Sequence, residues 1–171
     1  VSIFLTRLKQ RGIEITAEQF SGITSPLANI YAIPDHLHAL CNMLGDGLVP
    51  SNATAGYLAR MLARRVLRMR DELKLDVTLK DLAQHHLDVN LDGHLNKQHR
   101  EGLLIILGLE EERYAEMLRK GKNVINTQFK DVDQNATDIP DEILFTLNDS
   151  HGLAPDIVVN LARDAGWKSV T

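Results

Sequence analysis

The sequence has a single cysteine, no long apolar run and no strand-like alternation of polar and apolar residues over more than four positions. One cysteine, Cys41, cannot form an internal disulfide, and no stretch approaches the ~20 apolar residues of a membrane span. We therefore expect a protein of the reducing cytoplasm without a membrane-spanning segment. The N-terminal stretch lacks both an initiator methionine and the pattern of a secretory signal, so we expect a fragment of a longer chain.

Apolar residues recur at helical spacing along nearly the whole chain, which predicts an all-α protein. We expect an irregular helical bundle in residues 1–130, with one long helix at about 97–129, and a smaller C-terminal helical lobe in residues 131–171. The expected helices cover residues 2–11, 16–21, 26–33, 35–45, 52–72, 78–87, 97–129, 140–148 and 155–165. The polar segment 130–140 is expected to form a loop.

Capping residues, prolines and glycines mark the expected helix ends. Expected starts lie at Thr16 with Gln19, Ser25 with Pro26, Thr78 with Asp81, and Asp138 before Pro140. Expected ends lie at Gly45, Gly121 and Gly166. A break after Gly121 would shorten the long helix.

Positive charge is concentrated in one segment of a chain whose 19 Lys and Arg and 23 Asp and Glu give a formal net charge of -4. On the expected helix 52–72, every fourth position belongs to one row of residues on the same face, namely Asn52, Gly56, Arg60, Arg64 and Arg68. Its opposite side carries Leu58, Leu62, Val66 and Met69. Arginine guanidinium groups pair with phosphate oxygens, and a glycine lets an RNA strand approach the helix surface closely. An amide can form hydrogen bonds with the edge of a base. This face predicts RNA binding.

The same row of arginines has an alternative interpretation. Helical arginines are often solvated or paired with acidic neighbours, and a helical protein-interaction module could use this face to dock an acidic partner. Arg65 projects between Leu58 and Met61 on the apolar side, so we expect it to form a structural ion pair.

Other polar clusters suggest metal sites or simpler structural roles. Residues 88–99 place Asp88, Asn90, Asp92 and Gly93 as in a calcium loop, but His99 stands where a bidentate glutamate is needed. Histidines 85, 86, 94 and 99 have no nearby cysteine, which favours surface histidines over a zinc site. We expect no metal site here. Cys41 is expected in the core, and Asp35 and His36 are expected to begin a helix.

Residues 33–68, IPDHLHALCNMLGDGLVPSNATAGYLARMLARRVLR, closely resemble the tRNA-recognition region of alanyl-tRNA synthetases. The family pattern is present as Asp35-His36, Asp46-Gly47, Pro50-Ser51-Asn52, Gly56-Tyr57 and Arg64-Arg65. A second block, DIPDEILFTLNDSHGLAPDIVVNLARDAG, resembles the family's segment after the long helix and contains Asp149. GLEEERYAEMLRKG is similar to the charged helix between the two blocks. AGYLARM and DSHG resemble the archaeal type.

The resemblance implies a role in reading the acceptor stem of alanine tRNA. It implies that Asn52 and Asp149 read a G·U wobble pair and that Arg60, Arg64 and Arg68 hold phosphates. A wobble pair leaves a guanine amino group free in the shallow minor groove, where an oxygen can accept from it. Taken without the family, Asp149 has the surroundings of a turn or helix-capping aspartate.

The resemblance also implies a parent enzyme that joins alanine to its tRNA with ATP and Mg²⁺ in a class II catalytic domain, and an editing domain with zinc. Neither domain is visible in this sequence, so we expect tRNA binding without catalysis, no cofactor and no DNA partner. The bacterial pattern has arginine where this chain has Leu37-His38 and Thr54-Ala55. This difference argues against contacts from those positions to the tRNA backbone.

Overall fold

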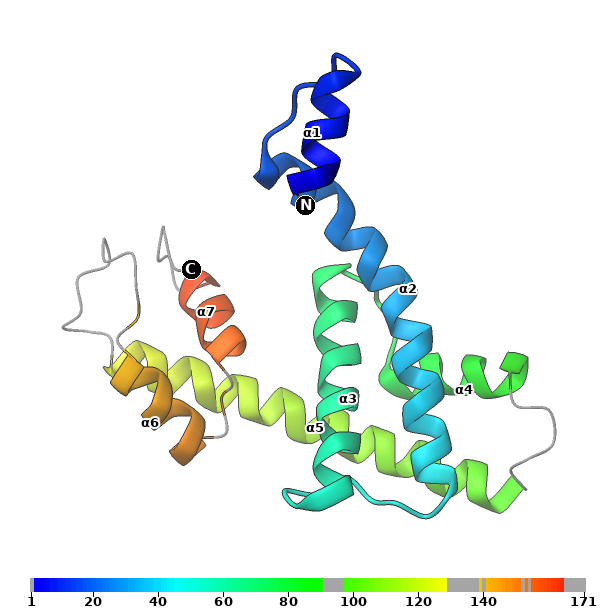
Figure 1. The fold of residues 1–171 in the computed structure, drawn as a ribbon. Helices are drawn as coiled ribbons and strands as arrows, with labels where there is room; N and C mark the ends of the chain where they lie inside the picture. The colour runs from blue at the N-terminus through cyan, green and yellow to red at the C-terminus, as the bar shows by residue number, and fades with distance from the viewer. Residues whose placement is uncertain are drawn as a thin grey trace. The chain divides into compact units, whose positions relative to one another are not determined.

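A computed structural model describes residues 2–90, 97–128, 139, 141–151, 153 and 155–164. This part of the chain forms helices and no strand, which confirms the all-α prediction (Figure 1). The helices are α1 (Ser2–Gln10), α2 (Ala17–Gly45), α3 (Thr54–Glu72), α4 (Leu79–Asn90), α5 (Lys97–Gln128), α6 (Asp141–His151) and α7 (Pro155–Asp164).

The chain divides into two compact units, Val1–Glu111 and Glu112–Thr171. The division falls inside α5, whereas the sequence analysis placed it near residue 130. The reason is that the second half of α5 packs with the C-terminal helices: a Cβ on Gly121 would lie 2.9 Å from Leu153 Cδ2 and 3.0 Å from Leu161 Cδ1. Gly121 therefore serves helix packing, and α5 continues through it without the expected break.

The first unit contains one helix, α2, where the sequence analysis expected three. The capping box at its start is confirmed, because Thr16 Oγ1 accepts from Gln19 N at 3.1 Å and Gln19 Oε1 accepts from Thr16 N at 2.9 Å. The expected start at Pro26 and the break near Pro34 are wrong, since both prolines lie inside α2. Both are exposed, so the carbonyls that lose their helical partner can bind water instead.

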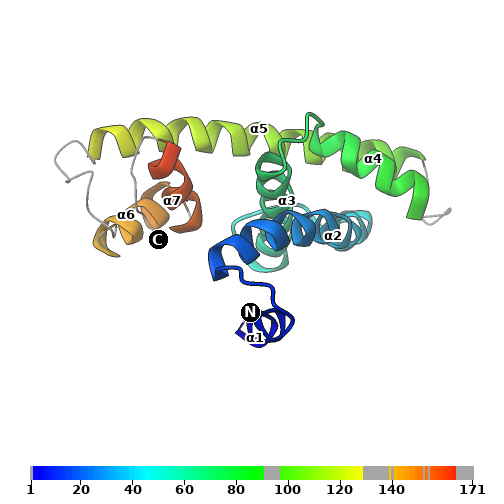
Figure 2. The ribbon, with the colours of Figure 1, turned by 90° about the horizontal axis from the view of Figure 1, so that it is seen from above.

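The core of the first unit lies where α3 and α4 pack on α2 (Figures 1 and 2). From α2 it buries Ile33, Leu37, Leu40, Cys41 and Leu44; from α3 it buries Ala59, Ala63, Val66, Leu67 and Met69; and α4 adds Leu79, Ala83 and Leu87. Small alanines on α3 allow close approach of the two helices. Cys41 is fully buried, as predicted, and burial raises the pKa of its thiol to about 12.

Candidate nucleic-acid interface

The arginine-rich helix α3 begins at Thr54, two residues later than the sequence predicted. Its N-cap, Ala53, supplies no side-chain hydrogen bond to the helix, and the preceding turn makes its own contacts with the start of α3. Ser51 Oγ accepts from Ala53 N at 3.3 Å, and Ser51 N donates to Gly56 O at 3.0 Å. The Pro50-Ser51-Asn52 segment is thus fastened to the first turn of α3.

Gly56 is buried beneath this turn. A Cβ at this position would lie 2.2 Å from Ser51 Oγ and 2.6 Å from Val49 O. The chain's own residues occupy the space that the sequence analysis assigned to an RNA strand, and the lack of a side chain allows the turn to close over the helix. We therefore assign Gly56 a packing role.

Asn52 lies in the turn, outside the helix, with its side chain exposed. Its Oδ1 accepts a hydrogen bond from Arg60 Nη1. The sequence analysis placed Asn52 and Arg60 on one helix face. The structure brings them together by a direct hydrogen bond, with Asn52 in the turn and Arg60 in α3.

Arg60 and Arg64 both reach across from α3 to Glu110 on α5. Arg60 Nε donates to Glu110 Oε1 at 3.0 Å, and Arg64 Nε lies 3.6 Å from the same oxygen. The Glu110 side chain is 1% exposed, whereas those of Arg60 and Arg64 are 15% and 27% exposed. Figure 2, which views α3 nearly end-on, shows this helix between α2 and the first half of α5.

Sequence reasoning missed Glu110, because GLEEERYAEMLRKG has the composition of a solvated helix. A signal was present: Leu103, Leu107, Glu110 and Tyr114 follow the i, i+4, i+7, i+11 spacing of one helix face, and all four are buried. A carboxylate on an apolar face needs a cationic partner.

The remaining arginines of α3 differ in their surroundings. Arg68 pairs with Glu72 one turn later, with Nε and Oε1 3.6 Å apart, and its side chain is 33% exposed. Arg65 is exposed, and the structure gives it no ion pair among the described residues, so the expectation of a structural ion pair on the apolar side is wrong. The buried face of α3 centres on Ala59, Ala63 and Val66, which turns Arg65 outward.

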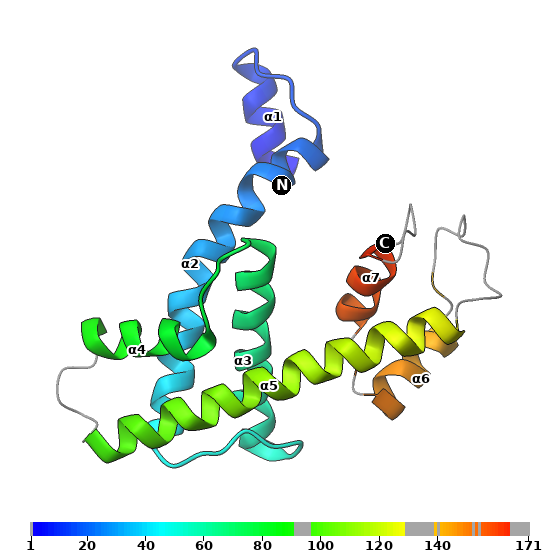
Figure 3. The ribbon, with the colours of Figure 1, turned by 180° about the vertical axis from the view of Figure 1, so that it is seen from behind.

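Arg70, near the C-terminal end of α3, makes hydrogen bonds and ion pairs within the protein. Its guanidinium binds Asp71, Glu111 and the Val77 carbonyl. Glu111 also accepts from Leu79 N at 2.8 Å, so one carboxylate joins the end of α3, the start of α4 and α5. Figure 3, the view from behind, shows α5 passing in front of α3.

Asp149 belongs to the second unit, in the last turn of α6. The helix was expected to end at residue 148 and instead continues to His151. The side chain of Asp149 lies outside the described part of the structure, so its role in reading the base pair remains a prediction from the resemblance.

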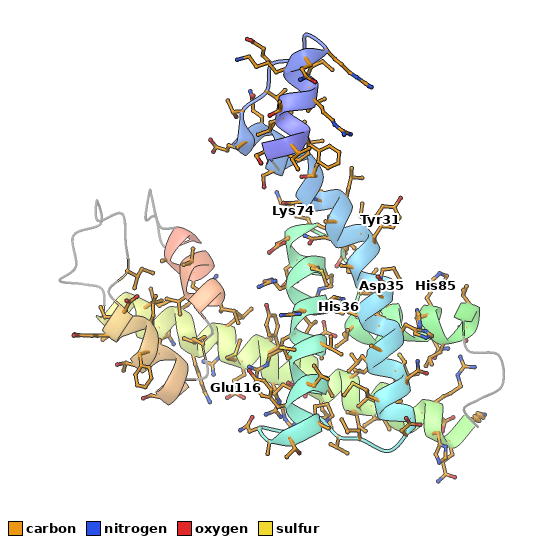
Figure 4. All side chains as sticks on the ribbon, in the orientation of Figure 1. Tyr31, Asp35, His36, Lys74, His85 and Glu116 are labelled. Carbon is orange, nitrogen blue, oxygen red and sulfur yellow. The ribbon has the colours of Figure 1, made fainter. Side chains whose placement is uncertain are left out.

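Three other sequence-based predictions concern a helix start, a calcium-like loop and a polar loop. Asp35 and His36 lie in the middle of α2, so the expected helix start is wrong there (Figure 4). Asp88 lies in α4, where hydrogen bonds from Gln84 and Arg100 lower the pKa of its carboxyl. The rest of the calcium-like pattern and the expected loop 130–140 fall largely outside the described residues.

Histidines at the contact of α2 and α4 form a pair. His86 Nε2 and His38 Nδ1 are 3.4 Å apart, and burial, followed by His38 and then His85, lowers the pKa of His86. Across the described ranges no group of three His, Cys, Asp or Glu side chains could hold a metal ion. In the helices that the structure describes, no segment is long and apolar enough to cross a membrane.

Known proteins are similar to this chain along nearly its full length. The family model described as tRNA synthetases class II (A) matches residues 3–169, and so extends to the N-terminal side of the two blocks that carry the resemblance. Alanine–tRNA ligases are 36% identical in Methanothermobacter thermautotrophicus and 40% identical in Methanothrix thermoacetophila, each over 90% of this chain and 17% of the relative. The Pyrococcus furiosus enzyme is 37% identical over 96% of this chain and 18% of its own length.

The chain thus spans less than a fifth of the length of these curated relatives. Helical architecture, the recognised motifs and the family match agree with one another. The chain belongs to the class II tRNA synthetases of the alanyl type.

Proposed function

We propose that this chain recognises the acceptor stem of alanine tRNA within an enzyme that joins alanine to its tRNA with ATP. The observation that carries the proposal is the exposed amide of Asn52, fixed by Arg60 beside the arginines of α3. Family membership supports tRNA as the partner, since the relatives are alanine–tRNA ligases. ATP, Mg²⁺ and zinc belong to the parent enzyme in this proposal.

In the proposed complex, Asn52 reads the G·U pair. Its Oδ1 has two lone pairs, of which Arg60 uses one. The other can accept from the guanine amino group that a wobble pair leaves free in the shallow minor groove of A-form RNA. Asp149 contributes a second, separate contact to the same pair.

Arginines with exposed surface supply the contacts to the RNA backbone. Arg64 and Arg68 are partly exposed, and Arg65 is exposed. Arg60 is left out of this group, because its three guanidinium nitrogens all donate to protein oxygens. This revises the sequence-based prediction that Arg60 holds a phosphate.

The test is a titration of this chain with two alanine acceptor minihelices that differ only in G·U or G·C at the recognised pair. We expect the G·C minihelix to bind roughly ten- to a hundredfold more weakly, because a wrong base pair in a recognition site costs about 1–3 kcal/mol of binding free energy. Asn52→Ala and Asp149→Ala should each reduce the difference, and the double variant should abolish it, as measured by fluorescence anisotropy. Asn42→Ala, an exposed asparagine of α2, is the matched control and should preserve the difference.

Equal affinities for both minihelices in the unmodified chain would refute base-pair recognition. Failure to bind either minihelix, together with binding to polyglutamate, would favour the alternative in which the arginine face docks an acidic protein partner.

A further inference from the structure

Glu110 is the most deeply buried charged side chain in the described part of the first unit. It lies on α5, is 1% exposed, and faces the guanidinium groups of Arg60 and Arg64. An isolated carboxylate is strongly disfavoured in such a place, so the ion pair holds both partners in a narrow range of positions. Burial also prevents Glu110 itself from touching RNA.

The guanidinium of Arg60 transmits this constraint to the turn before α3. Its Nε donates to Glu110 Oε1 at 3.0 Å, its Nη2 lies 3.4 Å from the Pro50 carbonyl, and its Nη1 donates to Asn52 Oδ1. The group is planar and rigid, so fixing Nε fixes the direction of the other two nitrogens. Glu110 therefore determines where Nη1 points.

This contact also sets the polarity of the Asn52 amide. Arginine has five N–H donors and no acceptor, so only the amide oxygen of Asn52 can face it. An amide turned the other way would bring Nδ2 against Arg60, donor against donor. It would then present an inverted pattern of donors and acceptors to a base edge, offering donors to the guanine amino group, which is itself a donor.

We propose that Glu110 is a positioning residue for base-pair recognition, acting through Arg60 to hold the Asn52 amide with its oxygen in a fixed place and orientation. The proposal rests on the proposed function, and it adds a residue from a distant helix that never contacts the RNA. A free Asn52 side chain, exposed in a turn, would sample several rotamers and both amide orientations. The fixed amide discriminates; a freely rotating one would accept either pair.

The test compares five variants of the 171-residue chain, Asn52→Ala among them, in the two-minihelix titration. Glu110→Leu fills the buried space but removes the acceptor, and we expect the preference for G·U over G·C to fall roughly tenfold. Affinity for the G·C minihelix should rise or stay unchanged, because Arg60 is released to bind phosphate. A merely structural role would lower both affinities together.

Glu110→Gln retains an oxygen for Arg60 Nε and should rescue most of the preference. Arg60→Lys keeps the positive charge but loses the fork, so it should reduce the preference as Glu110→Leu does, even if the latter folds poorly. Glu111→Gln is the matched control. Its carboxylate binds Arg70 and Leu79 N instead of Arg60, so its loss should affect thermal stability and leave the preference intact.

Circular dichroism establishes that each variant is folded before it is titrated. If Asn52→Ala reduces the preference while Glu110→Leu and Arg60→Lys both leave it unchanged, the positioning role is refuted and the proposed function stands. If Asn52→Ala leaves the preference unchanged, the proposed function fails and the positioning role fails with it.

Discussion

Gly56 is a residue whose importance lies in the side chain it lacks. The added Cβ of an alanine would meet Val49 O, a backbone atom, at 2.6 Å, besides Ser51 Oγ at 2.2 Å. A flexible side chain could move away from such a contact, but here the turn that carries Asn52 would itself have to shift. Stability and the candidate site are therefore linked at this residue.

Gly56→Ala should lower the free energy of unfolding by about 1–3 kcal/mol, because overpacking outweighs the better helix propensity of alanine. Gly102→Ala is the matched control. It also lies inside a helix, α5, and its added Cβ would meet nothing within 4 Å, so it should stabilise the chain by about 0.5–1 kcal/mol. Urea unfolding followed by circular dichroism measures both. Equal effects at the two positions would show that the turn does not close tightly over α3.

At the scale of elements, α2 is a single helix of 29 residues that contains two prolines. Proline in a helix interior removes one hydrogen bond and crowds the carbonyl four residues earlier. The helix persists because its second half buries Ile33, Leu37, Leu40 and Leu44 against the rest of the first unit. Tertiary packing thus overrides two local breakers.

Pro34→Ala should raise the free energy of unfolding by about 2–3 kcal/mol. The expected gain combines about 3 kcal/mol from restored helix propensity with an opposing term of up to about 1 kcal/mol from the freer unfolded chain. Pro155→Ala is the control, since Pro155 is the first residue of α7, where proline removes no helical hydrogen bond. Thermal unfolding followed at 222 nm should show stabilisation only for Pro34→Ala; stabilisation by both would contradict the explanation.

At the scale of the whole molecule, the net charge of -4 opposes general attraction to RNA. Binding must then depend on where positive charge is placed, and the proposal assigns it to Arg64, Arg65 and Arg68. Several other basic groups are occupied, as the contacts of Arg70 with Asp71 and Glu111 illustrate.

We expect the logarithm of the RNA association constant to fall with the logarithm of salt concentration with a slope of about -2 to -3, as for three phosphate contacts. Arg68→Gln should make this slope shallower by roughly 1. Arg7→Gln on α1 changes the net charge by the same amount and should leave the slope unaltered. Titrations from about 50 to 200 mM salt measure the three slopes; an identical change for both variants would indicate that only net charge matters.

The sequence by itself determined the helical class, the long helix that begins at residue 97, the capping box at Thr16 and the burial of Cys41, because these depend on local spacing and on the chemistry of single residues. Its motifs also identified the family, which the comparison confirmed.

Only the tertiary structure decided which charges remain on the surface. Helical periodicity places Arg60, Arg64 and Arg65 around one axis, but their roles depend on a carboxylate about fifty residues away and on which side of α3 packs against α2. Glu110 pairs with two of these arginines, because a buried charge needs a partner of opposite sign, and Arg65 is exposed, because the buried face of α3 lies on its other side. Gly56 lies under the chain's own turn, a contact that spacing along one helix cannot reveal.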